Sequence, residues 1–127
     1  MISPLYEELE GIGWQALGAW VERVDRAALP SGIVVKLRFW LVPGGFVDVF
    51  AAVSGRFAFH YEGREAGRGI YRHDNAPHGS ALACPTWPRH CHAGREGAIG
   101  ECALPEDLPG AFRTYCGLLI AYLSETP

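Results

Sequence analysis

Alternating apolar and polar positions mark a series of strands between residues 33 and 72. Residues 33–42 read Ile-Val-Val-Lys-Leu-Arg-Phe-Trp-Leu-Val, so Lys36 and Arg38 share one face while Leu37 and Phe39 share the other. A period of two predicts a half-buried strand. Residues 46–53, 56–62 and 68–72 are the next predicted strands, and glycine-containing turns or loops separate them. Short connections between consecutive strands favour hairpins, and therefore an antiparallel meander over residues 31–72.

Apolar residues at helical spacing predict a helix at the C-terminal end, over residues 105–124. Asp107 is a suitable N-cap for this helix, and Pro109 lies in its first turn, where a missing N–H costs little. The spacing places five side chains on one stripe that must be buried against the sheet: Leu108, Phe112, Tyr115, Leu119 and Tyr122.

Residues 1–30 predict a helical or mixed N-terminal extension. Ser3 and Pro4 suit a helix start, and Gly11 and Gly13 are expected to end or weaken that helix. Apolar residues from Trp14 onward continue at helical spacing, but residues 20–24 also read as an edge strand. We expect helix to about residue 17 and leave residues 20–28 open.

Residues 73–104 predict an irregular loop rich in histidine and proline. Breakers recur along it, including three prolines between residues 77 and 88. Long loops of this kind are usually functional or disordered. Leu82 and Trp87 argue against disorder, and we expect the loop to fold back so that the sheet buries them.

Together these elements predict an α+β fold in a single domain, residues 1–127. Its single antiparallel meander sheet has four to six strands, with an N-terminal helix and a C-terminal helix packed on the sheet. The large aromatic residues expected in the core are Trp14, Trp40, Phe57, Phe59 and Tyr115.

Composition supports a globular protein and excludes a membrane-spanning one. The 127 residues are 49% apolar and 20% charged, and no apolar run approaches the ~20 residues that a spanning helix needs. The first residues lack the basic and apolar regions of a signal peptide. The four cysteines show no Cys-x-x-Cys spacing, so we expect reduced thiols and a cytoplasmic location.

The charge is unevenly distributed along the chain. The net charge is −3, yet residues 32–95 carry eight basic and four acidic side chains. All five histidines lie in this middle part, between positions 60 and 92. A basic, histidine-rich centre between acidic ends favours an anionic ligand there, although scattered surface charge explains it nearly as well.

The densest polar cluster follows the last predicted strand of the meander, in residues 71–78. Asp74 and Asn75 suit turns, because their side chains bond nearby backbone N–H groups. Arg72 is a planar, permanently charged donor suited to phosphate or carboxylate, and His78 can exchange a proton near neutral pH. Polar side chains where a strand enters a loop are common at functional sites.

A second cluster, Arg89-His90-Cys91-His92, offers metal-binding chemistry. In an extended segment His90 and His92 point the same way, so both imidazoles can reach one ligand. A metal needs a third ligand, which Cys84, Cys91, His73 or His78 could supply. The spacing matches no standard zinc motif, and the alternative is that each histidine only bonds a carbonyl or carboxylate.

These motifs resemble the TumE-like family, small prokaryotic toxins of toxin–antitoxin pairs. The likeness covers residues 30–92 and rests on the string Arg72-His-Asp-Asn-Ala-Pro-His78 and on Pro88, His90 and His92. The family pattern is roughly Arg-Tyr-Asp-Asn-Ala-Pro-His followed by Pro-His-His-Lys-His. This chain therefore departs from it at His73, Arg89 and Cys91.

The resemblance implies a toxin that acts on RNA, with a small antitoxin protein as partner; we expect a metal-independent ribonuclease without a cofactor. The 2′-hydroxyl attack needs a base, an acid and a cation. His78 and His92 are the candidates for base and acid in either order, Arg72 for the cation, and Asp74 for orienting a histidine. Asn75, Arg89 and His90 are candidate binding residues.

Two alternatives remain open. A non-catalytic module could bind a nucleotide, RNA or a protein through the same loop, and a small metal-binding protein could hold zinc with His78, His90, His92 and Cys91. A homodimer is also left open. If the two clusters converge, Arg72, His78 and His92 should lie in one pocket, although 20 residues separate Arg72 from His92.

Overall fold

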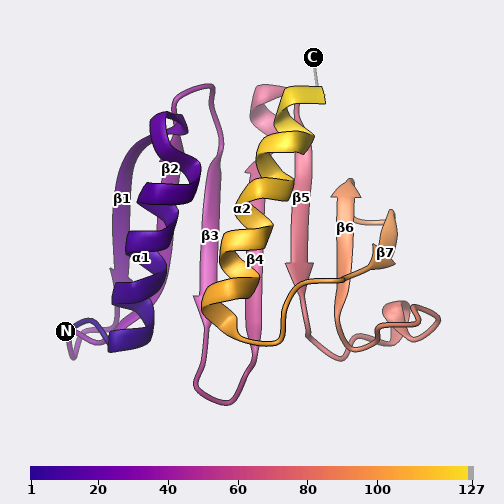
Figure 1. Ribbon diagram of the computed structural model, residues 1–127, viewed down its shortest axis with the longest axis horizontal. Coiled ribbons are helices and arrows are strands. Elements are labelled where there is room, and N and C mark those ends of the chain that lie inside the picture. The colour runs from indigo at the N-terminus through magenta and orange to yellow at the C-terminus, as the bar shows by residue number, and fades with distance from the viewer. Residues whose placement is uncertain (126–127) are drawn as a thin grey trace.

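The computed structural model describes residues 1–125, which form one antiparallel sheet with both helices on the same face (Figure 1). Seven strands lie in the order in which they occur along the chain, so the predicted meander is confirmed. The expected four to six strands were too few. The helices are α1 (Pro4–Leu17) and α2 (Leu108–Glu125); the strands are β1 (Val21–Ala28), β2 (Val34–Leu41), β3 (Phe46–Ala51), β4 (Phe57–Gly63), β5 (Gly69–Asp74), β6 (His90–Gly94) and β7 (Ile99–Glu101).

Helix α1 begins as predicted but runs through both of its internal glycines. The Ser3 hydroxyl accepts a hydrogen bond from the Tyr6 N–H at 3.2 Å, and the helix ends only before Gly18, which has a positive φ of 55°. A Cβ built on Gly13 would lie 2.2 Å from the Phe39 ring. Gly13 therefore lets the helix approach β2 closely and does not end it, and the expected end near residue 17 is confirmed.

The open question of residues 20–28 is settled as a strand, because β1 begins at Val21 directly after a short 3₁₀ turn, Gly18–Trp20. The two tryptophans expected in the core are not there. Trp14 is 45% exposed, and Trp40 is half-buried, with its indole N–H donating to Asp25 at 2.8 Å. Phe57 and Phe59 are buried as predicted.

Helix α2 buries its predicted stripe against the sheet. Phe112, Tyr115 and Leu119 are fully buried, and the Phe112 ring lies 5.1 Å from that of Phe59 on β4. Asp107 acts as the cap, since its carboxylate accepts a hydrogen bond from the Gly110 N–H at 2.8 Å. This packing forms the centre of the hydrophobic core, which α1 extends over β2.

Residues 73–104 are more regular than expected, because they contain β6 and β7. The alternation of His90, Cys91 and His92 is itself a strand pattern, which the surrounding prolines and glycines obscure. The irregular part is the connection of residues 75–89, with one 3₁₀ turn, Gly79–Ala81. Leu82 and Trp87 are 63% and 40% exposed, so the sheet does not bury them as predicted.

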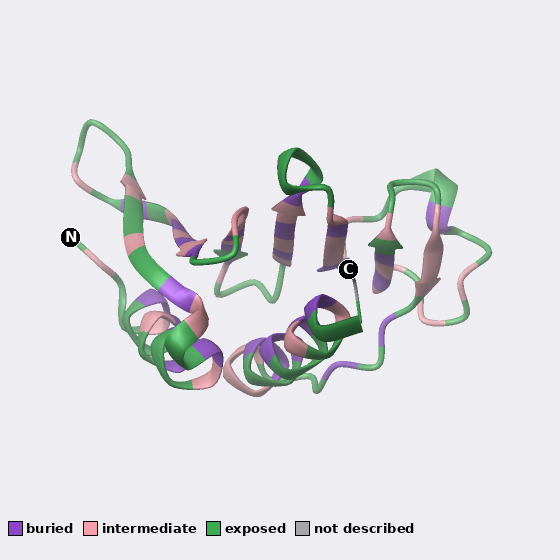
Figure 2. Ribbon diagram, turned by 90° about the horizontal axis from the view of Figure 1, so that it is seen from above, coloured by how far each residue is buried: buried purple, intermediate pink, exposed green. Residues whose placement is uncertain are grey.

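The face of the sheet opposite the helices carries a row of polar side chains. Seen from above, both helices lie on one side of the sheet, and the 3₁₀ turn of the 75–89 connection lies on the other side near β6 and β7 (Figure 2). On this second face, which we call the open face, neighbouring strands place six residues opposite one another: Asp25, Arg38, Asp48, His60, Arg72 and His92.

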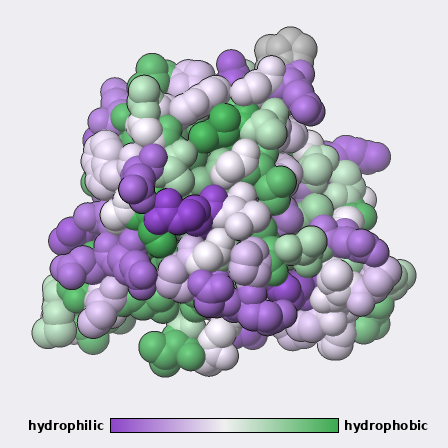
Figure 3. Space-filling model, in the orientation of Figure 1, coloured by the Kyte–Doolittle hydropathy of each residue, from purple (hydrophilic) through white to green (hydrophobic). Residues whose placement is uncertain are grey.

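The helix-bearing surface has a mixed character. In Figure 3, hydrophilic and hydrophobic side chains are interspersed over α1 and α2 rather than separated into large patches. Within residues 1–125, no helix combines the length and the apolar character that crossing a membrane requires.

Candidate functional site

Strand alternation places four of the predicted site residues side by side on the open face. Arg72 and Asp74 come from β5, and His92 and His90 are their respective partners across β6. Directly opposite residues of an antiparallel pair project from the same face. The two clusters identified in the sequence therefore meet here, because β5 and β6 pair in this register.

Asp74 is the buried centre of this cluster. Its side chain is 1% exposed, and one carboxylate oxygen accepts a hydrogen bond from the Arg72 Nε at 2.6 Å. The other oxygen accepts the Ala76 N–H at 2.8 Å, which is the turn role expected from sequence, and lies 3.5 Å from Nε2 of His90. Asp74 thus holds the arginine and the loop start, and it faces a histidine.

His90 and His92 are fixed in the same way, each through its Nδ1 atom. Nδ1 of His90 lies 2.8 Å from the carbonyl oxygen of Pro88, and Nδ1 of His92 lies 2.6 Å from that of Glu96. A carbonyl oxygen only accepts, so each Nδ1 carries the proton and donates it. The ring centroids are 5.1 Å apart, and Nδ1 donation leaves each Nε2 with its lone pair; that of His90 faces Asp74.

His78 lies in the exposed connection and contacts the cluster through the ring of His90. Its ring centroid is 6.2 Å from that of His90, and its backbone carbonyl accepts a hydrogen bond from the Trp87 indole at 3.3 Å. The structure thus brings His78 next to His90, and places Arg72 beside His92. The loop does return to the strand end, but Trp87 stays partly exposed while doing so.

A chain of hydrogen bonds extends from Arg72 along the open face. Its Nη1 donates to Nδ1 of His60 at 3.4 Å, and Nε2 of His60 donates to Glu62 at 3.2 Å. Arg64 forms two side-chain hydrogen bonds with the same carboxylate, at 2.7 and 2.9 Å. These bonds hold the pKa of Glu62 down at about 2, with the largest effect from Arg64.

Sequence reasoning missed His60 and Glu62 as parts of this site. The available signal was alternation within 56–62, which places both on the polar face of their strand. The pairing of His60 with Arg72 could not be read from that pattern, because it depends on the register between β4 and β5.

Two predicted binding residues, Asn75 and Arg89, form hydrogen bonds that fix the positions of loops. The Asn75 side chain accepts the Phe57 N–H at 2.9 Å and donates to the Gly55 carbonyl at 2.8 Å, which ties the end of β5 to the preceding hairpin. Arg89 pairs with Glu106 at 3.2 Å and donates to the Leu104 carbonyl. It therefore anchors the segment that leads into α2.

Cys91 lies on the helix side of the sheet, opposite His90 and His92, as alternation requires. It is the cross-strand partner of His73, which is buried and contacts Cys102. Burial lowers the pKa of His73 to about 4 and raises the pKa values of the Cys91 and Cys102 thiols. The four-residue zinc set proposed from sequence is therefore not assembled, because Cys91 faces away from the two histidines.

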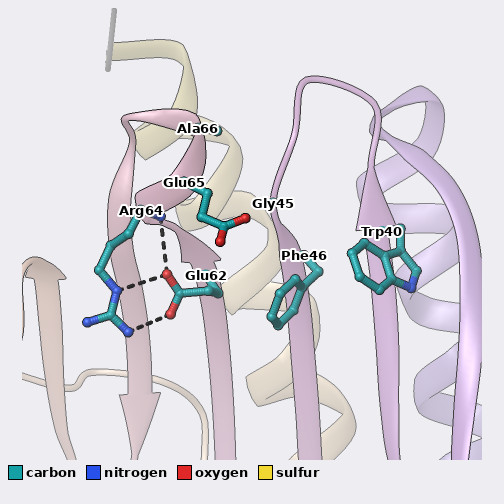
Figure 4. Close-up of a pocket in the computed structure, with 7 residues that line it drawn as sticks. All are labelled: Trp40, Gly45, Phe46, Glu62, Arg64, Glu65 and Ala66. Carbon is teal, nitrogen blue, oxygen red and sulfur yellow. Dashed lines mark hydrogen bonds and ion pairs between the residues drawn. The ribbon is translucent and has the colours of Figure 1, made fainter.

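A cavity of about 480 Å³ lies beside the hydrogen-bond chain that extends from Arg72 and shares Glu62 with it (Figure 4). Trp40, Phe46, Glu62 and Arg64 contribute to its wall, and no histidine does. Glu62 and Arg64 already neutralise each other there, as the dashed lines in Figure 4 show. We therefore place the candidate site at the histidine cluster rather than in this cavity.

Three residues of the cluster are arranged so that they could hold a metal ion. Ligand atoms of Asp74, His90 and His92 all lie within 4.8 Å of one another, and all three residues are buried. Two imidazoles and one carboxylate form a ligand set that suits several divalent transition metals.

Fold and site together define a small α+β protein with an arginine, a carboxylate and several histidines gathered on the helix-free face of a meander sheet. Comparison with known families gives the particular assignment. The chain belongs to the family of the toxin TumE, whose model matches residues 15–117, which confirms the resemblance seen in the sequence. No curated protein and no solved structure gives a significant match.

Proposed function

We propose that this protein is a toxin that cleaves RNA at the cluster of Arg72, Asp74, His78, His90 and His92. The observation that carries the proposal is the pairing of Arg72 with His92 across β5 and β6, with His78 beside His90. Membership in a toxin family supports the biological role. The chemistry of the cluster supports RNA as the target.

Arg72 is suited to bind the phosphate. Asp74 holds its Nε and His60 contacts its Nη1, so the guanidinium is fixed in place while its side chain remains partly exposed. A fixed guanidinium can donate two parallel hydrogen bonds to phosphate oxygens. It would stabilise the charge that develops on phosphorus when a 2′-hydroxyl attacks.

The histidines are suited to move protons. His78 is exposed and lies where it can approach a substrate bound over β5 and β6. Nε2 of His92 forms no hydrogen bond with any residue in the described part of the chain, and its Nδ1 is held by the Glu96 carbonyl. A held imidazole with a free nitrogen can serve as general base or acid. The histidine that Asp74 faces is His90 rather than either of these.

The test measures cleavage of a fluorescent RNA oligonucleotide by the purified chain. We expect His78→Ala and His92→Gln each to lower the rate by about 100-fold or more, as loss of a general acid or base does. The products should carry 2′,3′-cyclic phosphate, which a DNA analogue cannot form. Arg113→Ala is the control, because Arg113 is exposed on α2, on the other side of the sheet.

Unchanged rates in both histidine variants would contradict the proposal. RNA binding without cleavage, weakened steeply by salt, would instead support the non-catalytic module.

An antitoxin is proposed as the partner on family grounds. Co-expression of the product of a neighbouring gene should restore the growth of cells that express this chain. Expression of the His92→Gln variant alone should not slow growth.

A further inference from the structure

The two histidines of β6 are oriented as metal ligands are. We propose that Asp74, His90 and His92 bind one divalent transition-metal ion, of which Zn²⁺ is the best suited. The three residues share the open face at the point where β5 and β6 pair. The inference rests on this geometry and does not depend on RNA cleavage.

The hydrogen bonds of the two imidazoles set the required tautomer. Nδ1 of His90 donates to Pro88 and Nδ1 of His92 donates to Glu96, so both Nε2 atoms carry lone pairs. Metal-binding histidines usually donate their other ring N–H to a carbonyl or carboxylate in this way. Two neighbouring histidines with the same orientation supply two nitrogen ligands.

The spacing of the ligand atoms also fits a metal better than a direct ion pair. Nε2 of His90 lies 3.5 Å from Oδ1 of Asp74, which is longer than an ordinary N–H···O bond. Zn–N and Zn–O distances near 2.1 Å in a tetrahedron separate neighbouring ligands by about 3.4 Å. All three ligand atoms lie within 4.8 Å of one another, so small side-chain rotations suffice to close the site.

Burial and charge favour a metal that keeps an open position. Asp74 and His90 are 1% exposed and His92 is 8% exposed, so the ligands are shielded from water while the site still borders the surface. Three protein ligands leave a fourth position for water or substrate. One carboxylate, already shared with Arg72, leaves the loaded site positive and therefore suited to a phosphate.

If the metal is bound, the roles proposed for the histidines in RNA cleavage change. His92 would be a ligand and could not transfer a proton, so the proton transfer would fall to His78, which lies beside the site. A metal ion supplies a Lewis acid for the phosphate. Addition of a chelator should then abolish RNA cleavage, whereas cleavage by the side chains alone would continue.

The decisive experiment measures metal binding in the absence of RNA. Untagged protein is freed of metal with a chelator, exchanged into metal-free buffer and titrated with ZnCl₂ by calorimetry. We expect one Zn²⁺ per chain and a raised melting temperature. Co²⁺ should give the visible absorption of a tetrahedral or five-coordinate site. Absence of stoichiometric Zn²⁺ binding by the folded protein would overturn the proposal.

Variants decide whether these three residues are the ligands. His92→Gln and Asp74→Asn should each weaken Zn²⁺ binding by at least 100-fold and remove the Co²⁺ absorption. Cys91→Ser is the matched control, because Cys91 lies between the two histidines in β6 but on the other face of the sheet. Circular dichroism checks folding. Binding that survives His92→Gln, or that Cys91→Ser removes, would overturn the assignment.

Discussion

At the scale of single residues, Glu62 makes part of the protein's stability depend on pH. Its carboxylate accepts hydrogen bonds from the Arg64 side chain and backbone and from His60, and these hold its pKa at about 2 instead of the usual 4.5. A group whose pKa is depressed by folding stabilises the protein above its unfolded pKa. That contribution is lost as the pH falls from about 4.5 towards 2.

We predict that Glu62→Gln lowers the free energy of unfolding at pH 6 by about 1 kcal/mol, because Arg64 is exposed enough for solvent to screen the pair. The difference from wild type should shrink as the pH falls from 4.5 to 2.5. Urea denaturation at several pH values measures it. Glu65→Gln removes a charge from the exposed 3₁₀ turn that follows β4 and is the control. A difference that stays constant with pH for Glu62→Gln would refute the prediction.

At the scale of single elements, helix α1 depends on a close approach to the sheet. Gly13 is buried against Phe39, whereas Gly11 lies in the same helix with nothing within 4 Å of the position a Cβ would take. Two glycines only two residues apart therefore differ in what a methyl group would meet.

We predict opposite effects from adding a methyl group at these two positions. Gly13→Ala should destabilise the protein by about 1–3 kcal/mol, since Phe39 or the helix must shift to make room. Gly11→Ala should stabilise it by about 0.5–1 kcal/mol through helix propensity. Chemical denaturation of both variants is the measurement, and equal effects would show that the helix does not pack as described.

Helix α2 offers a similar comparison between neighbouring leucines. Leu119 is fully buried against the sheet, and Leu118 is 41% exposed. Leu119→Asp should unfold the domain or cost more than about 4 kcal/mol, because it buries an unpaired charge. Leu118→Asp, the same change one position earlier, should cost less than about 1 kcal/mol. Thermal melts followed by circular dichroism distinguish the two, and an unaltered melting temperature for Leu119→Asp would contradict this packing.

How far the sequence predicts these elements depends on the length of each pattern. In β2 and α2 the periodic pattern extends over many residues, and both elements were predicted closely. β6 and β7 have only five and three residues, and prolines and glycines flank them. Alternation alone correctly placed His90 and His92 on one face. It could not show that His92 pairs with Arg72, because the long connection between β5 and β6 leaves the register to tertiary packing.

On the scale of the whole molecule, the two faces of the sheet differ in the kinds of side chain that they carry. The helix side holds the apolar core, including the rings of Phe59, Phe112 and Tyr115, while the open face holds the arginine, the carboxylate and the histidines of the candidate site. Exposed side chains near the open face, such as His78, can therefore change with less loss of stability than those of the core. This separation is why site variants such as His78→Ala are informative about activity.

The two edges of the sheet limit how another protein can reach this site. β1, at one edge in Figure 1, has four charged residues among its eight, and β7, at the other edge, has three residues. Charged or very short edge strands discourage the addition of a further strand from another chain. A regulatory partner that shields Arg72 and His92 would therefore have to bind on top of the open face, where its own acidic groups could occupy the position proposed for the phosphate.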